Sequence, residues 1–260
     1  MKIDRQKLGQ KDGLAFLLIV DYSAVCRFIL ATALHTAMSS LSLVKPLSHL
    51  REEKEHVSEL LTEGFAIPAA HGAITEISGK SSVGKTAFVL SLLARLSADG
   101  GVCAVIDGSD SFDPRTARLA GIELDGILWV RCGGNVEKAF MAADLAVQAK
   151  GFGCIWLDLC GLQEQKLRMV PRTYWFRYRT RIKETPTVML VTTREPLTGS
   201  ASHRSYQFEL ESAVWSGSGK FQLLRELRVR TVDKGRPFSE PVSSVIFADH
   251  GEPEQSLLLP

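Results

Sequence analysis

The sequence predicts an α/β protein in which helices cover both faces of a mostly parallel, twisted sheet, with an antiparallel hairpin late in the chain. Three observations lead to this fold class. Short apolar runs of β type alternate with amphipathic helical stretches from residue 72 onwards. A glycine-rich segment separates one such run from the helix that follows it, and three longer β-type runs come one after another near the end of the chain.

Each element follows from its hydrophobic pattern. The runs that predict parallel strands are Ile74–Ser78, Cys103–Asp107, Ile127–Arg131, Cys154–Asp158 and Thr187–Thr193. Apolar residues at helical spacing predict helices over Lys85–Ala98 and Asn135–Lys150, and Gly151 is expected to stop the second. The late β-type runs are Tyr206–Trp215, Phe221–Val232 and Val242–Ala248, and a Gly217-Ser-Gly219 turn between the first two predicts an antiparallel hairpin.

The composition is typical of a folded chain. The 260 residues are 45% hydrophobic and carry 31 Lys and Arg against 29 Asp and Glu, which excludes disordered, collagen-like and disulfide-stapled classes. The five cysteines form no CxxC pair and are odd in number, so we expect thiols in a reducing compartment and a cytoplasmic protein without a zinc site.

The predicted organisation is an N-terminal helical segment and connector at residues 1–63, a core at residues 64–251 and a tail at residues 252–260. Within the connector, a short helix is expected at His56–Glu63 and a turn at Pro68–Gly72.

The apolar run from Gly13 to Leu34 has the length of a membrane span, but Asp21 and Arg27 interrupt it. We therefore expect a packed or partner-binding helix there, and no membrane segment. An alternative stays open, in which translation starts at Met38 and residues 1–37 are not native.

A complete GxxxxGK[ST] motif stands between the first parallel strand and its helix, which is the context that the motif requires. Its residues are Gly79, Lys80, Ser81, Ser82, Val83, Gly84, Lys85 and Thr86. Its glycines allow the backbone N–H groups to turn inward, and the helix places its positive end on the same phosphates. Lys85 is expected to reach the β- and γ-phosphates of ATP, and Thr86 to supply a hydroxyl to Mg²⁺.

An acidic residue at the end of another buried strand should complete the Mg²⁺ site. Asp158 ends the run Cys154–Asp158 and is the first candidate. Asp107 ends Cys103–Asp107 and is a second candidate, because the carboxyl ends of parallel strands line the same crevice.

At these residues the sequence resembles a bacterial RecA-type P-loop NTPase core. The strand Gly72–Gly79 is similar to the one that enters the RecA loop, and Cys103–Asp107 with Asp113-Pro114 is similar to the next strand and helix. Farther on, Arg228–Phe238 resembles the late hairpin and Ser244–Gly251 the last core strand, so the resemblance covers about residues 64–251.

The departures from the RecA pattern concern catalysis. The resemblance places the water-orienting acid at Ser109, with Asp110 one position along as a substitute catalytic residue. It places the adenine-stacking aromatic at Thr116, and the glutamine that senses the γ-phosphate at Thr193, or at Thr192 if the register slips.

Two further departures concern neighbouring protomers and DNA. The positions of the two lysines that touch a neighbour's nucleotide leave only Lys234 and Arg236 as candidates, and the loop Glu195–Arg204 is shorter than the DNA loop that it would replace. Retained nucleotide binding with eroded catalysis is most similar to the ImuA-type RecA paralogues, which are accessory proteins of translesion mutagenesis.

Positive charge gathers in the second half of the core, where basic residues interleave with aromatic ones between residues 166 and 183. This pattern suits single-stranded DNA, because guanidinium groups neutralise phosphates while rings stack on bases. The candidate contacts are Arg172, Arg177, Arg179, Arg181 and Arg204. Two alternatives remain: a protein-partner surface, or a helix over Arg172–Glu184 that packs Trp175, Tyr178 and Ile182 on the sheet with solvated arginines outside.

Three functional hypotheses result. The first is an ATP-binding accessory factor of the SOS response with weak or absent hydrolysis, which meets DNA, a translesion polymerase, another RecA-type protomer or its own copies. The second is an active DNA-dependent ATPase or recombinase, in which Asp110 positions the water. The third is a non-catalytic docking module that uses a RecA fold as a surface.

Overall fold

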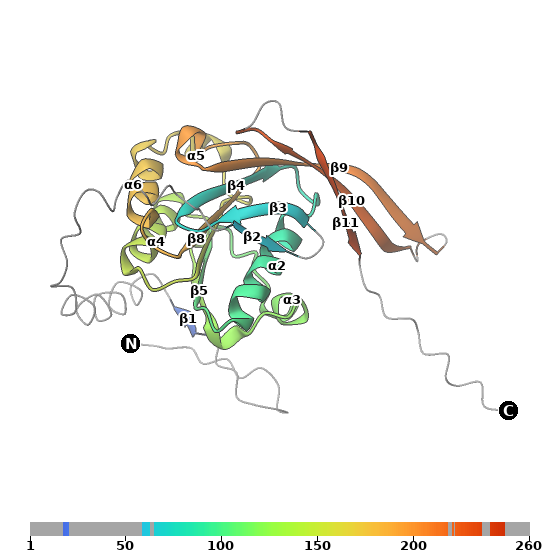
Figure 1. The fold of residues 1–260 in the computed structure, drawn as a ribbon, viewed down its shortest axis with the longest axis horizontal. Helices are drawn as coiled ribbons and strands as arrows, with labels where there is room; N and C mark the ends of the chain where they lie inside the picture. Colours follow the sequence, from blue (N-terminus) through green and yellow to red (C-terminus); the bar gives the residue numbers. More distant parts are fainter. Residues whose placement is uncertain are drawn as a thin grey trace, which may run out of the picture.

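A sheet of nine strands runs through the protein in the order β1-β6-β5-β7-β8-β4-β9-β10-β11 (Figure 1). This computed structural model describes residues 18–20, 59–62, 65–217, 220, 222–235 and 240–247. The strands are β1 (Leu18–Val20), β4 (Ala73–Gly79), β5 (Cys103–Asp107), β6 (Ile127–Arg131), β7 (Cys154–Asp158), β8 (Val188–Thr193), β9 (Arg204–Ser216), β10 (Leu223–Asp233) and β11 (Val242–Phe247).

The predicted fold class is confirmed. All neighbouring pairs from β1 to β9 are parallel, and β10 pairs antiparallel with both β9 and β11. The five predicted parallel strands coincide with β4 to β8 to within one residue at either end. Residues 218 and 219 of the predicted hairpin turn lie outside the described residues, but the antiparallel pairing that the turn implied is present.

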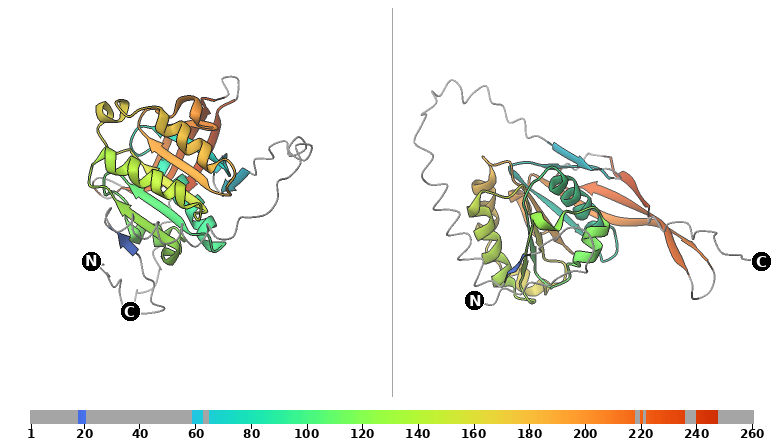
Figure 2. Two further views of the ribbon diagram at one scale, coloured as in Figure 1. Left: turned by 90° about the vertical axis from the view of Figure 1, so that its left-hand side faces the viewer. Right: turned by 90° about the horizontal axis from the view of Figure 1, so that it is seen from below.

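Helices cover both faces of this sheet (Figure 2). They are α2 (Lys85–Ala98), α3 (Pro114–Leu119), α4 (Val136–Ala149), α5 (Glu164–Arg168) and α6 (Thr173–Ile182), with short 3₁₀ turns at Leu124–Gly126 and Gly199–Ala201. One buried apolar cluster joins the sheet to α2 and α3, and the other joins it to α4, α5 and α6. Along β5, Cys103 and Val105 belong to the first cluster, while Ala104 and Ile106 belong to the second. This alternation explains why the central strands are continuously apolar.

Local signals set the helix ends. The N-cap of α4 is Asn135, whose side chain accepts a hydrogen bond from Lys138 N at 3.0 Å. The helix ends at Lys150, which adopts the left-handed conformation with φ 53°. Gly151, the predicted stop, therefore lies one residue beyond the reversal of the chain.

Two predictions for the N-terminal third are wrong where the structure describes it. Glu59–Thr62 forms strand β2, not helix, and pairs antiparallel with β3 (Phe65–Ala70), so Pro68 lies in a strand and the turn is confined to residues 71–72. Leu60 and Phe65 are buried against the cluster under α2, and this burial outweighs the local helical pattern.

The expected helix between Gly13 and Leu34 is also contradicted at Leu18–Val20, which forms β1 and pairs in parallel with β6 at the edge of the sheet. The other residues up to 58 lie outside the described part, as do residues 248–260. Among the described helices, none is long and apolar enough to cross a membrane.

Candidate phosphate-binding site

The glycine-rich loop, residues 79–86, connects the buried strand β4 to the first turn of α2. Ser82 and Gly84 have positive φ angles of 61° and 84°, and such left-handed positions let successive N–H groups converge on an anion. Gly84 caps α2, since its carbonyl accepts the first helical hydrogen bond from Phe88 N at 3.1 Å. Gly79 has φ 148°, and a Cβ atom there would collide with the carbonyl of Phe208 on β9. The loop therefore has the backbone form of an anion site.

Lys85 lies inside this loop and is only 7% exposed. Its Nζ donates to the carbonyls of Gly79 and Lys80, the second at 2.8 Å. Burial lowers the pKa of Lys85, while nearby Cys160 and Asp158 partly offset this effect. The ammonium group is thus held at the start of the loop, with the acidic end of β7 beside it.

Asp158 ends β7 in a fixed orientation. Its Oδ1 accepts hydrogen bonds from Cys160 N at 3.0 Å and from the Thr192 hydroxyl at 2.8 Å. Its Oδ2 contacts the Ser111 hydroxyl at 3.2 Å. The carboxylate is buried, and its influence on the pKa of Lys85 places it within electrostatic range of that ammonium group.

Mg²⁺ fits these groups. It prefers oxygen ligands and binds through one or two protein groups together with phosphate and water oxygens. The Asp158 carboxylate and the exposed Thr86 hydroxyl in the first turn of α2 are the oxygen donors that would hold it. The described residues contain no cluster of three or more metal-ligating side chains, so the phosphates would have to complete the coordination.

Asp107 ends β5 directly opposite Asp158 in the β5–β7 register, as expected, but its carboxylate is used within the fold. It is completely buried and accepts hydrogen bonds from Ser111 N at 2.9 Å, Phe112 N at 2.8 Å and Trp129 Nε1 at 3.2 Å. This carboxylate therefore shapes the loop after β5.

Ser109 and Asp110 diverge in that loop. The side chain of Ser109 packs so closely on Gly161 that a Cβ at position 161 would overlap it. Asp110 has φ 60°, and its carboxylate forms an ion pair with Arg131 at 3.0 Å and accepts from Gly133 N at 3.1 Å. Because β6 lies on the opposite side of β5 from β7, the Asp110 carboxylate is turned away from Asp158.

The end of β8 differs from the predicted arrangement. Thr193 has 0% exposure, and its hydroxyl is enclosed without a hydrogen-bond partner, so it does not line the open edge of the sheet in this structure. The reason is strand alternation: Thr192 faces Asp158, Thr193 faces the opposite way, and Arg194 is the first exposed residue. Sequence reasoning missed Arg194, which stands directly after the buried strand β8, although a similar signal identified Asp158, the charged last residue of the buried strand β7.

The comparisons with known proteins cover this same region. Residues 60–162 match the RecA N-terminal domain. The match contains the glycine-rich loop, Lys85 and Asp158.

Curated relatives align over 87 residues, which is 34% of this chain and 25% of each relative. Protein RecA of Cutibacterium acnes is 39% identical over that segment, that of Acinetobacter baumannii 38% and that of Acinetobacter baylyi 37%. The chain thus spans about a quarter of the length of the curated relatives that it matches.

Helix α6 lies beyond the segment that matches RecA. Of the five arginines predicted to contact DNA, it contains Arg177, Arg179 and Arg181, and Arg172 directly precedes it. Its apolar side chains pack inside the protein, as the alternative prediction of a helix on the sheet expected. Trp175, Tyr178 and Ile182 are all buried. Arg177 and Arg181 both bind Oδ1 of Asp144 on α4, at 2.8 and 2.6 Å. These two arginines therefore hold α6 on α4, and Asp144 neutralises part of their charge in this arrangement.

Arg204 is likewise engaged within the fold. It lies in β9 with 9% of its side chain exposed, between Glu59 at 2.8 Å and Asp233 at 3.1 Å. The prediction that Arg204 contacts DNA does not fit this geometry, because its guanidinium ties β2 and β10 to β9.

Arg172 and Arg179 remain on the outer side of α6. Both are exposed, and Arg179 donates to the Ser200 carbonyl at 3.1 Å. Phe176 lies one helical turn from each and is 45% exposed. We call Arg172, Phe176 and Arg179 the outer face of α6.

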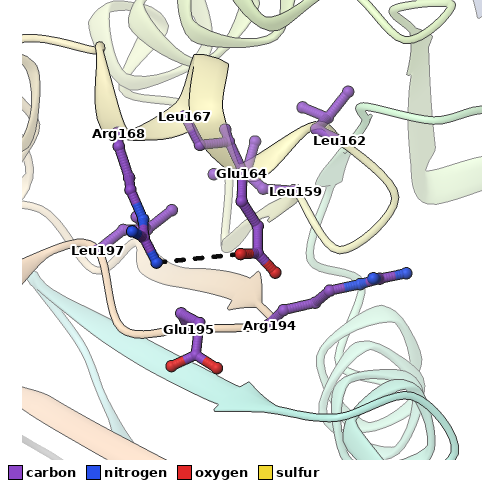
Figure 3. Close-up of a pocket in the computed structure, with 8 residues that line it drawn as sticks. All are labelled: Leu159, Leu162, Glu164, Leu167, Arg168, Arg194, Glu195 and Leu197. Atoms are coloured by element: carbon purple, nitrogen blue, oxygen red, sulfur yellow. Dashed lines mark ion pairs between the residues drawn. The ribbon is translucent and has the colours of Figure 1, made fainter.

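A small pocket lies between the turn after β7 and the loop after β8 (Figure 3). Leucines 159, 162, 167 and 197 line it, and its rim carries Glu164, Arg168, Arg194 and Glu195. Glu164 and Arg168, which lie one turn apart on α5, form an ion pair at 4.0 Å, whereas the guanidinium of Arg194 extends away from both.

The carboxylate of Glu76 in β4 holds the loop after β8 by hydrogen bonds. Its Oε1 accepts from Leu197 N at 2.6 Å and Thr198 N at 3.0 Å, and its Oε2 contacts the hydroxyls of Thr198 at 2.8 Å and Ser205 at 3.0 Å. Glu76 is 1% exposed. The strand that enters the glycine-rich loop therefore also positions the loop that begins at Arg194.

Proposed function

We propose that this protein is a RecA-like ATP-binding protein of DNA repair. Residues Gly79 to Thr86 would hold the phosphates of ATP, with Lys85 on the β- and γ-phosphates and Mg²⁺ between Thr86 and Asp158. The observation that carries the proposal is the buried Lys85 ammonium, which lies inside a left-handed loop at the head of α2 and beside the acidic end of β7. The match of this segment to the RecA N-terminal domain supports it.

We further propose an accessory role in damage-induced mutagenesis, of the ImuA type, with weak or absent hydrolysis. Hydrolysis needs a group that positions the attacking water. Position 109 is a serine, and Asp110 is engaged with Arg131 and Gly133 on the far side of β5. The carboxylates at or directly after the ends of β5 and β7, Asp107, Asp110 and Asp158, are each held by other groups.

ATP binding and turnover, with and without single-stranded DNA, test this proposal. We expect a fluorescent ATP analogue to bind with Mg²⁺, Lys85→Met to abolish that binding, and turnover to stay near zero. Equal retention by the native protein and Lys85→Met would refute nucleotide binding. DNA-stimulated turnover that Asp110→Ala removes would instead support an active ATPase.

For single-stranded DNA we propose the outer face of α6, with Arg172 and Arg179 on phosphates and Phe176 stacked on a base. The supporting observation is the contrast along one helix: Arg177 and Arg181 are paired with Asp144, while the outer face is exposed. Arg172→Ala should reduce the salt slope of binding by about 0.7, the contribution of one phosphate contact on a single strand. The matched control is Arg177→Ala, which should leave the slope unchanged; equal effects of the two variants would exclude this surface.

The remaining parts of the proposal are the cellular location and the protein partners. A cytoplasmic location agrees with the four described cysteines, which are all free thiols. A translesion polymerase subunit, another RecA-type protomer or a second copy would be the protein partner. Co-purification with each tests these partners. A chain that shows no thermal shift with ATP and Mg²⁺ yet binds a polymerase subunit would favour a non-catalytic docking module.

A further inference from the structure

Arg194 is attached to both sides of the candidate phosphate site. Its backbone carbonyl accepts a hydrogen bond from Gly79 N, the first residue of the glycine-rich loop, at 3.1 Å. Its Nε donates to the carbonyl of Cys160, in the turn after β7, at 3.1 Å. Within the described residues Arg194 forms no ion pair, and its side chain is exposed.

The same two residues also lie next to Lys85. The carbonyl of Gly79 accepts from the Lys85 ammonium group, and the thiol of Cys160 is a close neighbour of that group. Burial is the main cause of the lowered pKa of Lys85, and the charge of Arg194 lowers it further. In Figure 3 the guanidinium extends away from Glu164 and Arg168. Lys85 and Arg194 are therefore both hydrogen-bonded to Gly79, and the charge of Arg194 lies close enough to Lys85 to lower its pKa.

Two like charges at close range repel one another until an anion lies between them. A phosphate group does this well, because a guanidinium binds its oxygens in a planar fork while an ammonium binds as a point charge. The lysine of this motif reaches the β- and γ-phosphates, so a second cation close to it would be placed to contact the terminal phosphate.

Resting on the proposed nucleotide binding, we propose that Arg194 and Lys85 form a two-cation clamp on the terminal phosphate, so that the protein distinguishes nucleoside triphosphates from diphosphates by charge. Lys85 would serve both nucleotides, because it also reaches the β-phosphate. Arg194 would contact only the triphosphate. The discrimination requires no hydrolysis, so the clamp would report which nucleotide is bound even if the protein does not turn it over.

The test measures the affinities of fluorescent ATP and ADP analogues with Mg²⁺ on the full chain. Arg194→Gln removes the charge, and Arg194→Lys keeps the charge but removes the fork and the Nε bond to Cys160. The matched control is Arg168→Gln, an arginine on the same pocket rim that pairs with Glu164. We expect Arg194→Gln to weaken the binding of ATP by about 10- to 100-fold, which is the effect of losing a charge-assisted hydrogen bond. The binding of ADP should weaken by less than about twofold. Arg194→Lys should recover part of the ATP affinity, and Arg168→Gln should change neither nucleotide.

Three outcomes would overturn the inference. Equal losses of ATP and ADP in Arg194→Gln would show that Arg194 acts only by tethering the two loops. An unchanged ATP affinity would show that no contact exists, and the same selectivity loss in Arg168→Gln would show a general charge effect. Failure of the native protein and Lys85→Met to differ is a separate result, which would refute nucleotide binding itself. A thermal melt of each variant checks folding.

Discussion

Replacing Glu76 by leucine should destabilise the protein far more than replacing it by glutamine. Oε1 accepts two backbone N–H groups, from Leu197 and Thr198, which can only donate. Oε2 faces the hydroxyls of Thr198 and Ser205, which can rotate and accept instead. A glutamine can therefore keep its oxygen on the two N–H groups and turn its amide nitrogen toward the hydroxyls.

The magnitudes follow from this count. The leucine variant leaves two N–H groups unpaired, one buried and one partly buried, at about 1–3 kcal/mol each. The free energy of unfolding should therefore fall by about 2–6 kcal/mol. Glutamine keeps these bonds but makes them neutral, which should cost about 1–2 kcal/mol. A chain of this size has about 5–15 kcal/mol in total, so the leucine variant is close to the limit of folding.

Urea denaturation monitored by tryptophan fluorescence measures the free energies of unfolding, and hydrogen exchange at the amides of Leu197 and Thr198 reports the loop directly. Both amides should exchange slowly in the native protein and in Glu76→Gln, and rapidly in Glu76→Leu. Thr198→Val is the control, because it removes only a hydroxyl contact on Oε2. Equal destabilisation by glutamine and leucine would show that the negative charge, not the pattern of acceptors, holds the loop, and the reasoning would fail.

Three further predictions concern packing and thiol chemistry. Asp144→Ala removes the partner of Arg177 and Arg181, which are 40% and 34% exposed, so the free energy of unfolding should fall by only about 1 kcal/mol. This loss should lower the Tm by about 2–4 °C, and the difference in Tm should become smaller in 1 M salt. An unchanged Tm would contradict the pairing. Phe88→Ala empties a fully buried site between two aromatic rings and should cost about 3–5 kcal/mol in urea denaturation, whereas a cost below 1 kcal/mol would refute the packing. Burial, and then the charge of Asp158, raises the pKa of the Cys160 thiol from 9.0 to about 12, so at pH 8 iodoacetamide should modify it about a thousandfold more slowly than a thiol of ordinary pKa. The rate of modification should rise about tenfold per pH unit up to that pKa. Rapid labelling of Cys160 at pH 8, measured by mass spectrometry, would contradict this prediction.

Local pattern was sufficient for the central strands and the loop between β4 and α2. Strands β5, β6 and β7 begin and end at the predicted residues, because a continuous apolar run with a charged or glycine-rich end is a local feature. The same approach was wrong at Glu59–Thr62, where a charged neighbourhood suggested helix. Pairing with β3 and burial of Leu60 decided that segment, and neither is visible in a short window.

The candidate site shows the same division. The position of Asp158 near the glycine-rich loop could be predicted because it ends a buried parallel strand, and parallel strands meet at one edge. The sequence could not decide which of Thr192, Thr193 and Arg194 faces the site, since a shift of one residue reverses which face of the sheet a strand side chain occupies.

The sequence by itself therefore determined the fold class, the glycine-rich loop and the acidic strand end, because these depend on residue type and short spacing. The tertiary structure alone decided which charged side chains are free. Arg177 meets Asp144 across 33 positions and Arg204 meets Glu59 across 145, so no local pattern could tell them from Arg172 or Arg194. The physical reason is that the residue type alone sets the charge of a side chain, whereas the packing of elements distant in the sequence determines which partner neutralises it.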